Sequence, residues 1–167
     1  MADKYLYNNS GTVTERSAIV TSAGAGDSGK IPGLDAGGQL DQSFMPTGIG
    51  ADTASITASE ALAAGDLVNV WNSTGAKVRK ADATTAGKEA HGFVKASVSS
   101  SASATVYFEG GITGLTSLTP GVQYLSTTPG IASATAPSAS GNVVQRVGFA
   151  TAATALNFDA GTPIVLA

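Results

Sequence analysis

One stretch of the sequence has the spacing of a phosphate-binding loop. Residues 24–30, Gly-Ala-Gly-Asp-Ser-Gly-Lys, fit the G-x-x-x-x-G-K pattern, in which backbone amides and a lysine surround phosphate oxygens. However, Ile31 stands where a serine or threonine would bind magnesium. Pro32 and Gly33 follow where a helix should begin and direct its N-terminus at the phosphate. The sequence therefore argues against nucleotide binding, and we expect a flexible loop.

Other arrangements that could support catalysis or metal binding are incomplete. Residues 26–29, Gly-Asp-Ser-Gly, are similar to the nucleophile segment of serine proteases, but a nucleophilic serine needs a general base within hydrogen-bond distance. The single histidine, His91, lies in a turn-like segment, and the chain has no cysteine. The 12 acidic residues are scattered and show no calcium-loop spacing. We expect no enzymatic activity, no cofactor and no metal site.

Charge and hydropathy exclude two classes of partner. The chain has 9 basic and 12 acidic residues, a net charge of -3, and therefore no basic field that would hold nucleic acid. Lys77, Arg79 and Lys80 form one local basic cluster, which we interpret as a solvated strand face, with a salt contact to an acidic partner surface as the alternative. No segment approaches 18 uninterrupted apolar residues, and the first residues lack a secretory signal. We expect no membrane contact and no export by the general pathway.

The chain is predicted to consist of an extended N-terminal arm, residues 1–50, and a compact domain, residues 51–167. The 167 residues suffice for one domain plus such an arm. Residues 5–7 and 18–20 could form short strands, whereas residues 22–29 contain three glycines and cannot pack a core. We expect a partner surface to order the arm, for example by strand addition. The alternative is a merely disordered N-terminus.

The remaining sequence predicts an all-β domain, a small β-sandwich or barrel. Short β-type runs recur every 8–15 residues, with Gly, Asn, Ser and Asp between them, a pattern typical of such folds. These runs are residues 55–57, 66–71, 76–79, 92–95 and 104–108. The one helical candidate is residues 59–64, a single turn that would end at Gly65.

An internal repeat predicts that the domain is built from two similar β units. Residues 62–65 align with residues 118–121, and Gly92-Phe93 aligns with Gly148-Phe149, both at a separation of 56 positions. We place the two units at residues 62–110 and 118–161. After Glu109 the charged side chains are Arg146 and Asp159, so other subunits are expected to cover part of this half. The predicted subunit contacts are Trp71, Phe149 and Phe158.

Residues 29–46 resemble a segment of tailed-phage virion proteins, including tail fibres and head decoration proteins. The shared pattern is GK-hydrophobic-P-x-LD-x-x-G-x-LD-x-S-x-x-P, and here it reads GKIPGLDAGGQLDQSFMP. Further segments resemble the small β module of phage capsid decoration (cement) proteins, and together with the first they cover roughly two thirds of the chain. These segments are residues 61–68, 80–83, 92–95, 118–126, 142–148 and 156–158.

The resemblance implies a non-enzymatic structural protein on the outer surface of the phage head. Members of this family are usually homotrimers that sit at local threefold positions and clamp adjacent major capsid subunits. It also implies an N-terminal arm that reaches along the capsid surface. For this arm we predict capsid contacts from apolar and aromatic residues: Tyr5, Leu6, Tyr7, Ile19, Val20, Leu34, Leu40 and Phe44.

The same module also occurs in tail fibres, so a tail-fibre or collar component, or a receptor-binding adhesin, is the alternative. A fibre normally continues into long shaft and tip segments, whereas this chain ends at Ala167. We therefore expect a decoration protein rather than a fibre.

Overall fold

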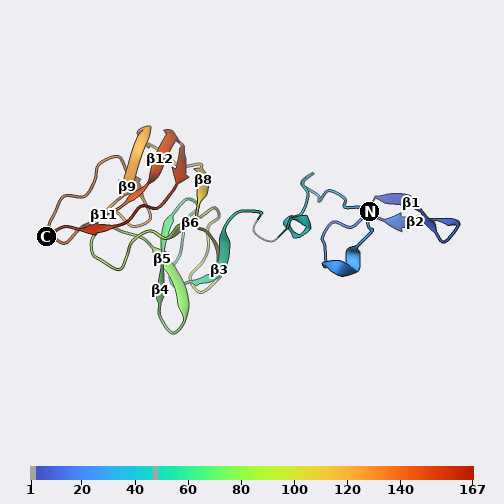
Figure 1. The fold of residues 1–167 in the computed structure, drawn as a ribbon. Helices are drawn as coiled ribbons and strands as arrows, with labels where there is room; N and C mark the ends of the chain where they lie inside the picture. The colour runs from blue at the N-terminus through green and yellow to red at the C-terminus, as the bar shows by residue number, and fades with distance from the viewer. Residues whose placement is uncertain (1–2, 47–48) are drawn as a thin grey trace. The chain divides into compact units, whose positions relative to one another are not determined.

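The computed structural model describes residues 3–46 and 49–167, and the chain divides into two compact units at residue 50. Residues 1–2 and 47–48 of the predicted arm lie outside this description. All regular elements of the described residues are strands, apart from two short 3-10 helices (Figure 1). The all-β prediction is therefore confirmed. We call residues 1–50 the N-terminal unit and residues 51–167 the C-terminal unit.

The N-terminal unit is built around one β-hairpin. Strands β1 (Lys4–Asn9) and β2 (Thr12–Ser17) pair antiparallel across the two-residue turn Ser10-Gly11. Both turn residues have positive φ, 53° and 96°, as the favoured two-residue hairpin turn requires. The predicted strand at residues 5–7 thus lies within β1. The predicted strand at residues 18–20 is reduced to a single parallel bridge between Ile19 and Pro32.

Two 3-10 turns complete the N-terminal unit, and both are closed by local hydrogen bonds. Helix η1 (Ala25–Asp27) lies in the glycine-rich stretch, and η2 (Gln42–Phe44) follows Asp41, whose carboxylate accepts a hydrogen bond from the Ser43 amide. An isolated two-stranded hairpin is marginally stable in water, because it has no second layer to pack against. This unit is therefore held by backbone and turn hydrogen bonds rather than by a core.

The first half of the C-terminal unit is a closed five-stranded barrel, which we call the first β-unit. Its strands pair in the order β3-β5-β4-β6-β7, and the parallel pairing of β3 with β5 closes the barrel. The strands are β3 (Thr53–Ala58), β4 (Leu67–Asn72), β5 (Ala76–Lys80), β6 (Gly92–Val94) and β7 (Ser103–Tyr107). The expected helical turn at residues 59–64 is wrong: Leu62 instead makes a bridge to Val98, and its backbone is committed to that pairing.

The second half contains an open five-stranded sheet, which we call the second β-unit. Its order, β10-β9-β12-β13-β8, repeats the order β5-β4-β6-β7-β3 of the barrel, but β10 and β8 remain separate edges. The strands are β8 (Gly110–Thr113), β9 (Gly121–Leu125), β10 (Ala132–Ser133), β12 (Arg146–Ala152) and β13 (Ala155–Phe158). A separate pair consists of β11 (Val143–Val144) and β14 (Ile164–Val165).

Two apolar clusters form the core of the C-terminal unit. One fills the barrel with alternate residues of its strands, including Val68, Val78, Val94 and Val106. The other lies between the outer face of the barrel and the inner face of the open sheet. Phe93 of the barrel is central to it, because its ring stacks on Tyr107 at 5.4 Å and meets Phe158 of the open sheet at 5.6 Å.

A glycine occupies the same place in both β-units, where two backbones approach each other closely. Gly92 precedes Phe93 on β6, and Gly148 precedes Phe149 on β12. A Cβ on Gly92 would lie 2.5 Å from the Tyr107 carbonyl oxygen, and one on Gly148 would overlap the Asn157 carbonyl oxygen. Gly148 also has φ 132°, which side-chain-bearing residues rarely adopt. The repeat in the sequence therefore marks a steric requirement at each glycine.

We expect Gly148→Ala to lower the free energy of unfolding by about 2 kcal/mol or more, because both the carbonyl contact and the positive φ oppose a side chain. Gly111→Ala, on strand β8 of the same sheet, is the matched control: a Cβ there meets nothing within 4 Å. Urea denaturation, followed by circular dichroism, measures the free energy of unfolding of both variants. Equal stability of the two variants would contradict the steric account.

Candidate interaction surfaces

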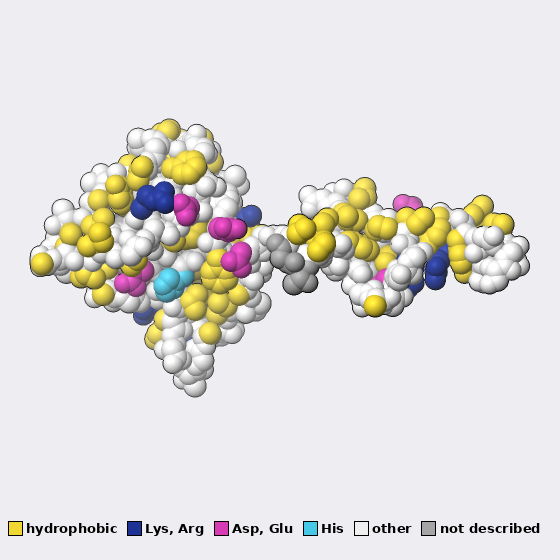
Figure 2. All heavy atoms as spheres, in the orientation of Figure 1, with side chains coloured by type: hydrophobic (Ala, Val, Ile, Leu, Met, Phe, Trp, Pro, Cys, Tyr) yellow, Lys and Arg dark blue, Asp and Glu magenta, His cyan; other side chains and the backbone are white. Residues whose placement is uncertain are grey.

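The N-terminal unit has no core of its own. None of its described residues, 3–46 and 49–50, is buried, and Figure 2 shows hydrophobic side chains over much of its visible surface. Eight of the thirteen large hydrophobic side chains that are exposed in the described chain belong to it. They are Leu6, Val13, Val20, Ile31, Leu34, Leu40, Met45 and Ile49. So much exposed apolar side chain on a segment of this length is typical of a binding surface.

The hairpin presents two different faces. On one, Tyr5 and Tyr7 lie beside each other, and the Arg16 guanidinium lies 4.8 Å from the centre of the Tyr7 ring. On the other, Leu6 and Val13 are 69% and 67% exposed. This second face also carries the exposed pair Lys4–Glu15, at 2.7 Å. The tyrosine face is thus occupied within the unit, whereas the Leu6–Val13 face is free to contact a partner.

The predicted arm contacts divide into two groups. Exposed members are Leu6, Val20, Leu34 and Leu40, while Tyr5, Tyr7, Ile19 and Phe44 are half-buried. Sequence reasoning overlooked the exposed Val13, although the alternation of Thr12-Val13-Thr14 places it on one strand face with the side chains of Glu15 and Ser17. It also overlooked Ile31, which no periodicity identifies.

The glycine-rich stretch that resembles a phosphate-binding loop is closed around a carboxylate. Asp27 accepts hydrogen bonds from the Lys30 ammonium at 2.5 Å and from the Ala23 amide at 2.6 Å. These hydrogen bonds hold the pKa of Asp27 below its usual value. The lysine that would contact phosphate is therefore paired with an acidic side chain, and the segment is an ordered turn rather than the flexible loop we expected.

The two aspartates of the virion-protein pattern serve as turn caps. The Asp35 carboxylate accepts hydrogen bonds from the amides of Gly37 and Gln39, at 2.8 and 2.9 Å. Asp41 caps η2, and the hydrogen bonds it accepts from Ser43 lower its pKa. In each Leu-Asp pair, an exposed leucine is followed by an aspartate whose carboxylate closes a turn. Leu34 and Leu40 are therefore each held at the start of a local turn.

The outer face of the open sheet carries the second exposed apolar surface. Phe149 on β12 lies directly opposite Val122 on β9, and the two side chains are 44% and 49% exposed. On the other side Phe149 pairs with Asn157 of β13, which pairs with Gly111 of β8. The charged residues nearest in sequence are Arg146 on β12 and Asp159, which follows β13, and they bind each other at 2.6 Å. This cross-strand row is therefore uncharged, and Val122 and Phe149 form its apolar part.

The three predicted subunit contacts lie in different environments. Phe149 is on the exposed row, and Trp71 is half-buried on the outer face of the barrel. Phe158 is 1% exposed and packs in the core against Phe93, so its side chain is not available for a subunit contact. Strand alternation accounts for this difference, since Phe158 points to the inner face of the open sheet and Phe149 to its outer face.

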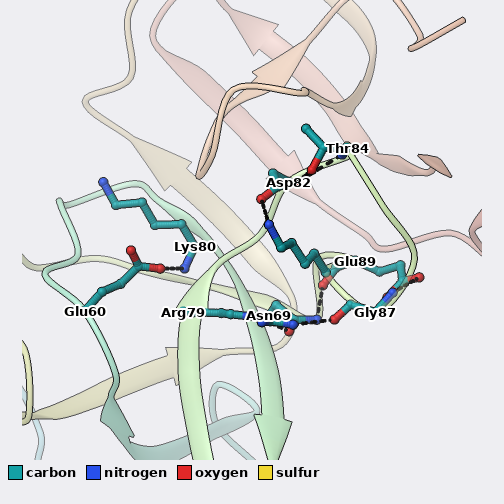
Figure 3. Close-up of polar contacts among 9 residues, drawn as sticks. Glu60, Asn69, Arg79, Lys80, Asp82, Thr84, Gly87 and Glu89 are labelled. Carbon is teal, nitrogen blue, oxygen red and sulfur yellow. Dashed lines mark hydrogen bonds and ion pairs between the residues drawn. The ribbon is translucent and has the colours of Figure 1, made fainter. Parts of the chain in front are cut away.

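Two members of the basic cluster on β5, Arg79 and Lys80, are engaged within the chain. Arg79 donates hydrogen bonds to the Asn69 side chain at 3.0 Å and to the Gly87 carbonyl at 2.7 Å (Figure 3). Its guanidinium also lies 4.6 Å from the centre of the Trp71 ring. Lys80 lies 3.3 Å from the Asp66 carboxylate. Our interpretation as a solvated strand face is therefore wrong for Arg79, whose guanidinium holds the loop that follows β5.

That loop, residues 81–91, is fixed by a buried carboxylate. Asp82 is 4% exposed and accepts hydrogen bonds from Thr84 and from the Lys88 ammonium, which lies 3.0 Å away (Figure 3). Burial raises the pKa of Asp82, but the hydrogen bonds from Thr84 and Lys88 outweigh it and hold the pKa below its usual value. At the end of the loop, Nδ1 of His91 accepts a hydrogen bond from the Val70 amide at 3.0 Å, so His91 extends the pairing of β4.

The described part of the chain contains no group of three or more His, Cys, Asp or Glu side chains that could hold a metal ion. Among the same residues, no helix has the length and apolar character needed to cross a membrane.

Comparison with known proteins gives no relative: no family model, no curated protein and no solved structure matches this chain. The candidate surfaces are therefore assigned from the geometry of this chain alone.

Acid should selectively weaken the Asp82 loop. Because the pKa of Asp82 is lowered in the folded state, its stabilisation is fully present above the ordinary carboxyl value of 3.8 and is lost as the pH falls below it. We expect Asp82→Asn to cost about 1–3 kcal/mol at pH 7 and to remove part of the acid dependence. Urea titrations between pH 2.5 and 7, followed by Trp71 fluorescence, measure this. A wild-type acid slope in the variant would contradict it.

The two phenylalanines of the open sheet should respond in opposite ways. Phe158→Ala removes a core ring and should cost about 3–5 kcal/mol of stability. Phe149→Ser should change stability little but weaken self-association, measured by sedimentation velocity. Thr151→Ser, at an exposed position further along β12, is the control. Unchanged self-association of Phe149→Ser would exclude the Val122–Phe149 row as a subunit contact.

Proposed function

We propose that this chain is a structural virion protein that binds the outer surface of a tailed-phage head and stabilises the capsid by bridging major capsid subunits. The observation that carries the proposal is the contrast between its two units. The C-terminal unit has its own core, whereas the N-terminal unit has exposed apolar side chains and no buried residue among those described. The resemblance of residues 29–46 to virion proteins supplies the identity of the partner.

The N-terminal unit has the properties of a segment that binds along another protein. Its backbone is preformed in a hairpin and three turns closed by aspartate carboxylates, so less conformational entropy is lost on binding than for a disordered arm. Its hairpin has two edges that can accept a further strand. The Leu6–Val13 face supplies apolar anchors, and so do Leu34 and Leu40, each of which precedes an aspartate that closes a turn. This combination suits an arm that lies along a capsid surface.

Self-association adds to the strength of attachment. In the second β-unit the Val122–Phe149 row is exposed, and the nearby charges are paired with each other. We propose that this row contributes to a homotrimer. A trimer that contacts three capsid sites gains avidity, because the second and third contacts form at high effective concentration. Linking adjacent capsid subunits in this way resists their separation by internal pressure. The proposal includes no catalytic step, cofactor or nucleic acid.

The test is cosedimentation of the purified protein with expanded heads that lack it, together with its mass by light scattering. We expect saturable binding by a species of three chains. Residues 51–167 alone contain the nineteen hydrophobic side chains that are buried among the described residues and should fold, but they should fail to bind heads. Head binding by residues 51–167 at full affinity would overturn the role of the N-terminal unit.

Point variants separate the arm from the rest of the protein. We expect Leu6→Asp to weaken head binding at least tenfold, since it places a charge on the exposed hairpin face, with the circular dichroism spectrum unchanged. Asn9→Asp, at an exposed position on the same strand, is the control for added charge. A full-length trimer that ignores heads but binds tails or host cells would replace this proposal with a tail-fibre, collar or adhesin function.

A further inference from the structure

The single histidine takes the place of a strand partner beside β4. The pairing of β6 with β4 begins at Gly92, which lies opposite Val68, and the His91 amide donates to the Val68 carbonyl at 2.8 Å. Beyond this point, the Val70 amide donates to Nδ1 of the His91 imidazole at 3.0 Å. A side chain therefore accepts the hydrogen bond that a backbone carbonyl would accept if β6 were longer.

This hydrogen bond requires a neutral imidazole. A ring nitrogen accepts through its lone pair, whereas both nitrogens of a protonated histidine carry a proton and only donate. When Nδ1 accepts, the proton of the neutral ring is on Nε2. His91 is exposed to solvent, and histidine side chains ordinarily take up a proton between about pH 5 and 8. Protonation of the ring therefore removes the acceptor of the Val70 amide.

The pocket beside His91 also contains a carboxylate residue. Glu89 and His91 line the same pocket, which has a volume of about 320 Å³. The Glu89 carboxylate accepts a hydrogen bond from the Gly87 amide at 2.9 Å, so it helps to fold the 81–91 loop. A carboxylate binds a charged donor more strongly than a neutral amide. The protonated imidazole therefore has an alternative partner within the loop.

The other segments around this pocket add few charges. Strand β4 (Leu67–Asn72) has no charged residue, and neither has the segment 160–163, which lines the pocket with Gln145. The charged side chains next to these segments are already engaged with partners. They are Arg79 beside the loop, Asp82 and Lys88 within it, and Arg146 and Asp159 next to Gln145 and Ala160. Glu89 is therefore the charged residue that a protonated His91 meets in the pocket.

We propose that His91 is a pH-dependent switch for the end of the 81–91 loop. The neutral imidazole holds the Val70 amide. On taking up a proton from solvent, the imidazole releases this amide and donates to the Glu89 carboxylate, which then holds the Gly87 amide less firmly. This switch goes beyond the proposed function and does not depend on binding to a head.

The change should remain local, because the neighbouring contacts do not involve titrating groups. The Asn69 side-chain amide donates to the Glu89 carbonyl at 2.8 Å. The buried Gln145 side chain binds both the N–H and the carbonyl of Ala90, at 2.8 and 2.9 Å. These contacts keep the backbone at Glu89 and Ala90 in place. Protonation of His91 therefore frees the Val70 amide and loosens the loop without unfolding the barrel.

Amide hydrogen exchange of the full-length protein, resolved by residue with NMR, tests the switch. We compare the Val70 amide at about pH 7.5 and about pH 5, after correction for the pH dependence of intrinsic exchange, and expect at least tenfold lower protection in acid. The Val143 amide, which donates to the Ala83 carbonyl at 2.9 Å at the start of the loop, is the internal control. It should stay equally protected. Equal protection of Val70 at both pH values would overturn the proposal, and so would loss of protection at Val143.

Two variants assign the response to His91. His91→Asn is the matched variant, because its Oδ1 takes the place of Nδ1 as an acceptor and does not titrate. Its Val70 amide should be equally protected at both pH values. His91→Ala removes the acceptor, so the Val70 amide should be poorly protected at both. An acid-induced loss of protection that persists in His91→Asn would overturn the proposal.

The tautomer of the imidazole provides an independent measurement. His91 is the only histidine, so the nitrogen signals of its ring are identified without further variants. We expect ¹⁵N NMR spectra at about pH 7.5 to show a proton on Nε2 and none on Nδ1. A proton on Nδ1 would overturn the proposal. A loop that loosens only below the ordinary carboxyl value of 3.8 would also overturn it, because that response belongs to Asp82.

Discussion

The packing of the open sheet on the outer face of the barrel is the interaction on which the C-terminal unit depends. Phe93 and Leu67 point outward from the barrel, and without the second β-unit they would be exposed to water. Phe158 and Leu156 of the open sheet cover them, and the ring of Phe93 lies between Tyr107 and Phe158. Neither β-unit could bury the apolar side chains of this shared cluster alone, because each supplies one half of it.

The same packing also explains why the outer faces of the two β-units differ. The outer row of the barrel is covered by the second β-unit, whereas the equivalent row of the second β-unit, with Val122 and Phe149, has no third unit to cover it. When each of two similar β-units can cover the outer face of the one before it, the outer face of the second unit stays uncovered. The unpaired edges β8 and β10 are a consequence of the same open architecture. Both features leave apolar side chains or backbone hydrogen-bonding groups exposed on the second β-unit.

The N-terminal unit is organised by a different kind of interaction. Its turns are closed by carboxylates that accept backbone hydrogen bonds, at Asp27, Asp35 and Asp41. Such local hydrogen bonds fix a backbone without burying side chains, so the apolar residues between them stay exposed. In the C-terminal unit the corresponding carboxylate, Asp82, is buried, and its contacts with Thr84 and with the Lys88 ammonium hold a loop beside the core. The C-terminal unit is therefore held by a buried core, and the N-terminal unit by turns whose apolar side chains stay exposed.

The sequence by itself determined that the protein is all-β, where the strands of the first β-unit lie, and that Gly92 and Gly148 hold equivalent places. These features depend on neighbouring residues: β-type runs, turn residues and a repeated glycine where backbones meet. The sequence could not show that Phe149 is exposed and Phe158 buried. Exposure depends on which face of the sheet each side chain occupies, and that face is set by the strand register. It likewise could not show that Arg79 holds the 81–91 loop, that Asp27 neutralises Lys30, or that the second β-unit remains open. Those features were decided by tertiary structure, because each depends on which distant segments pair, and pairing is set by the packing of the whole domain.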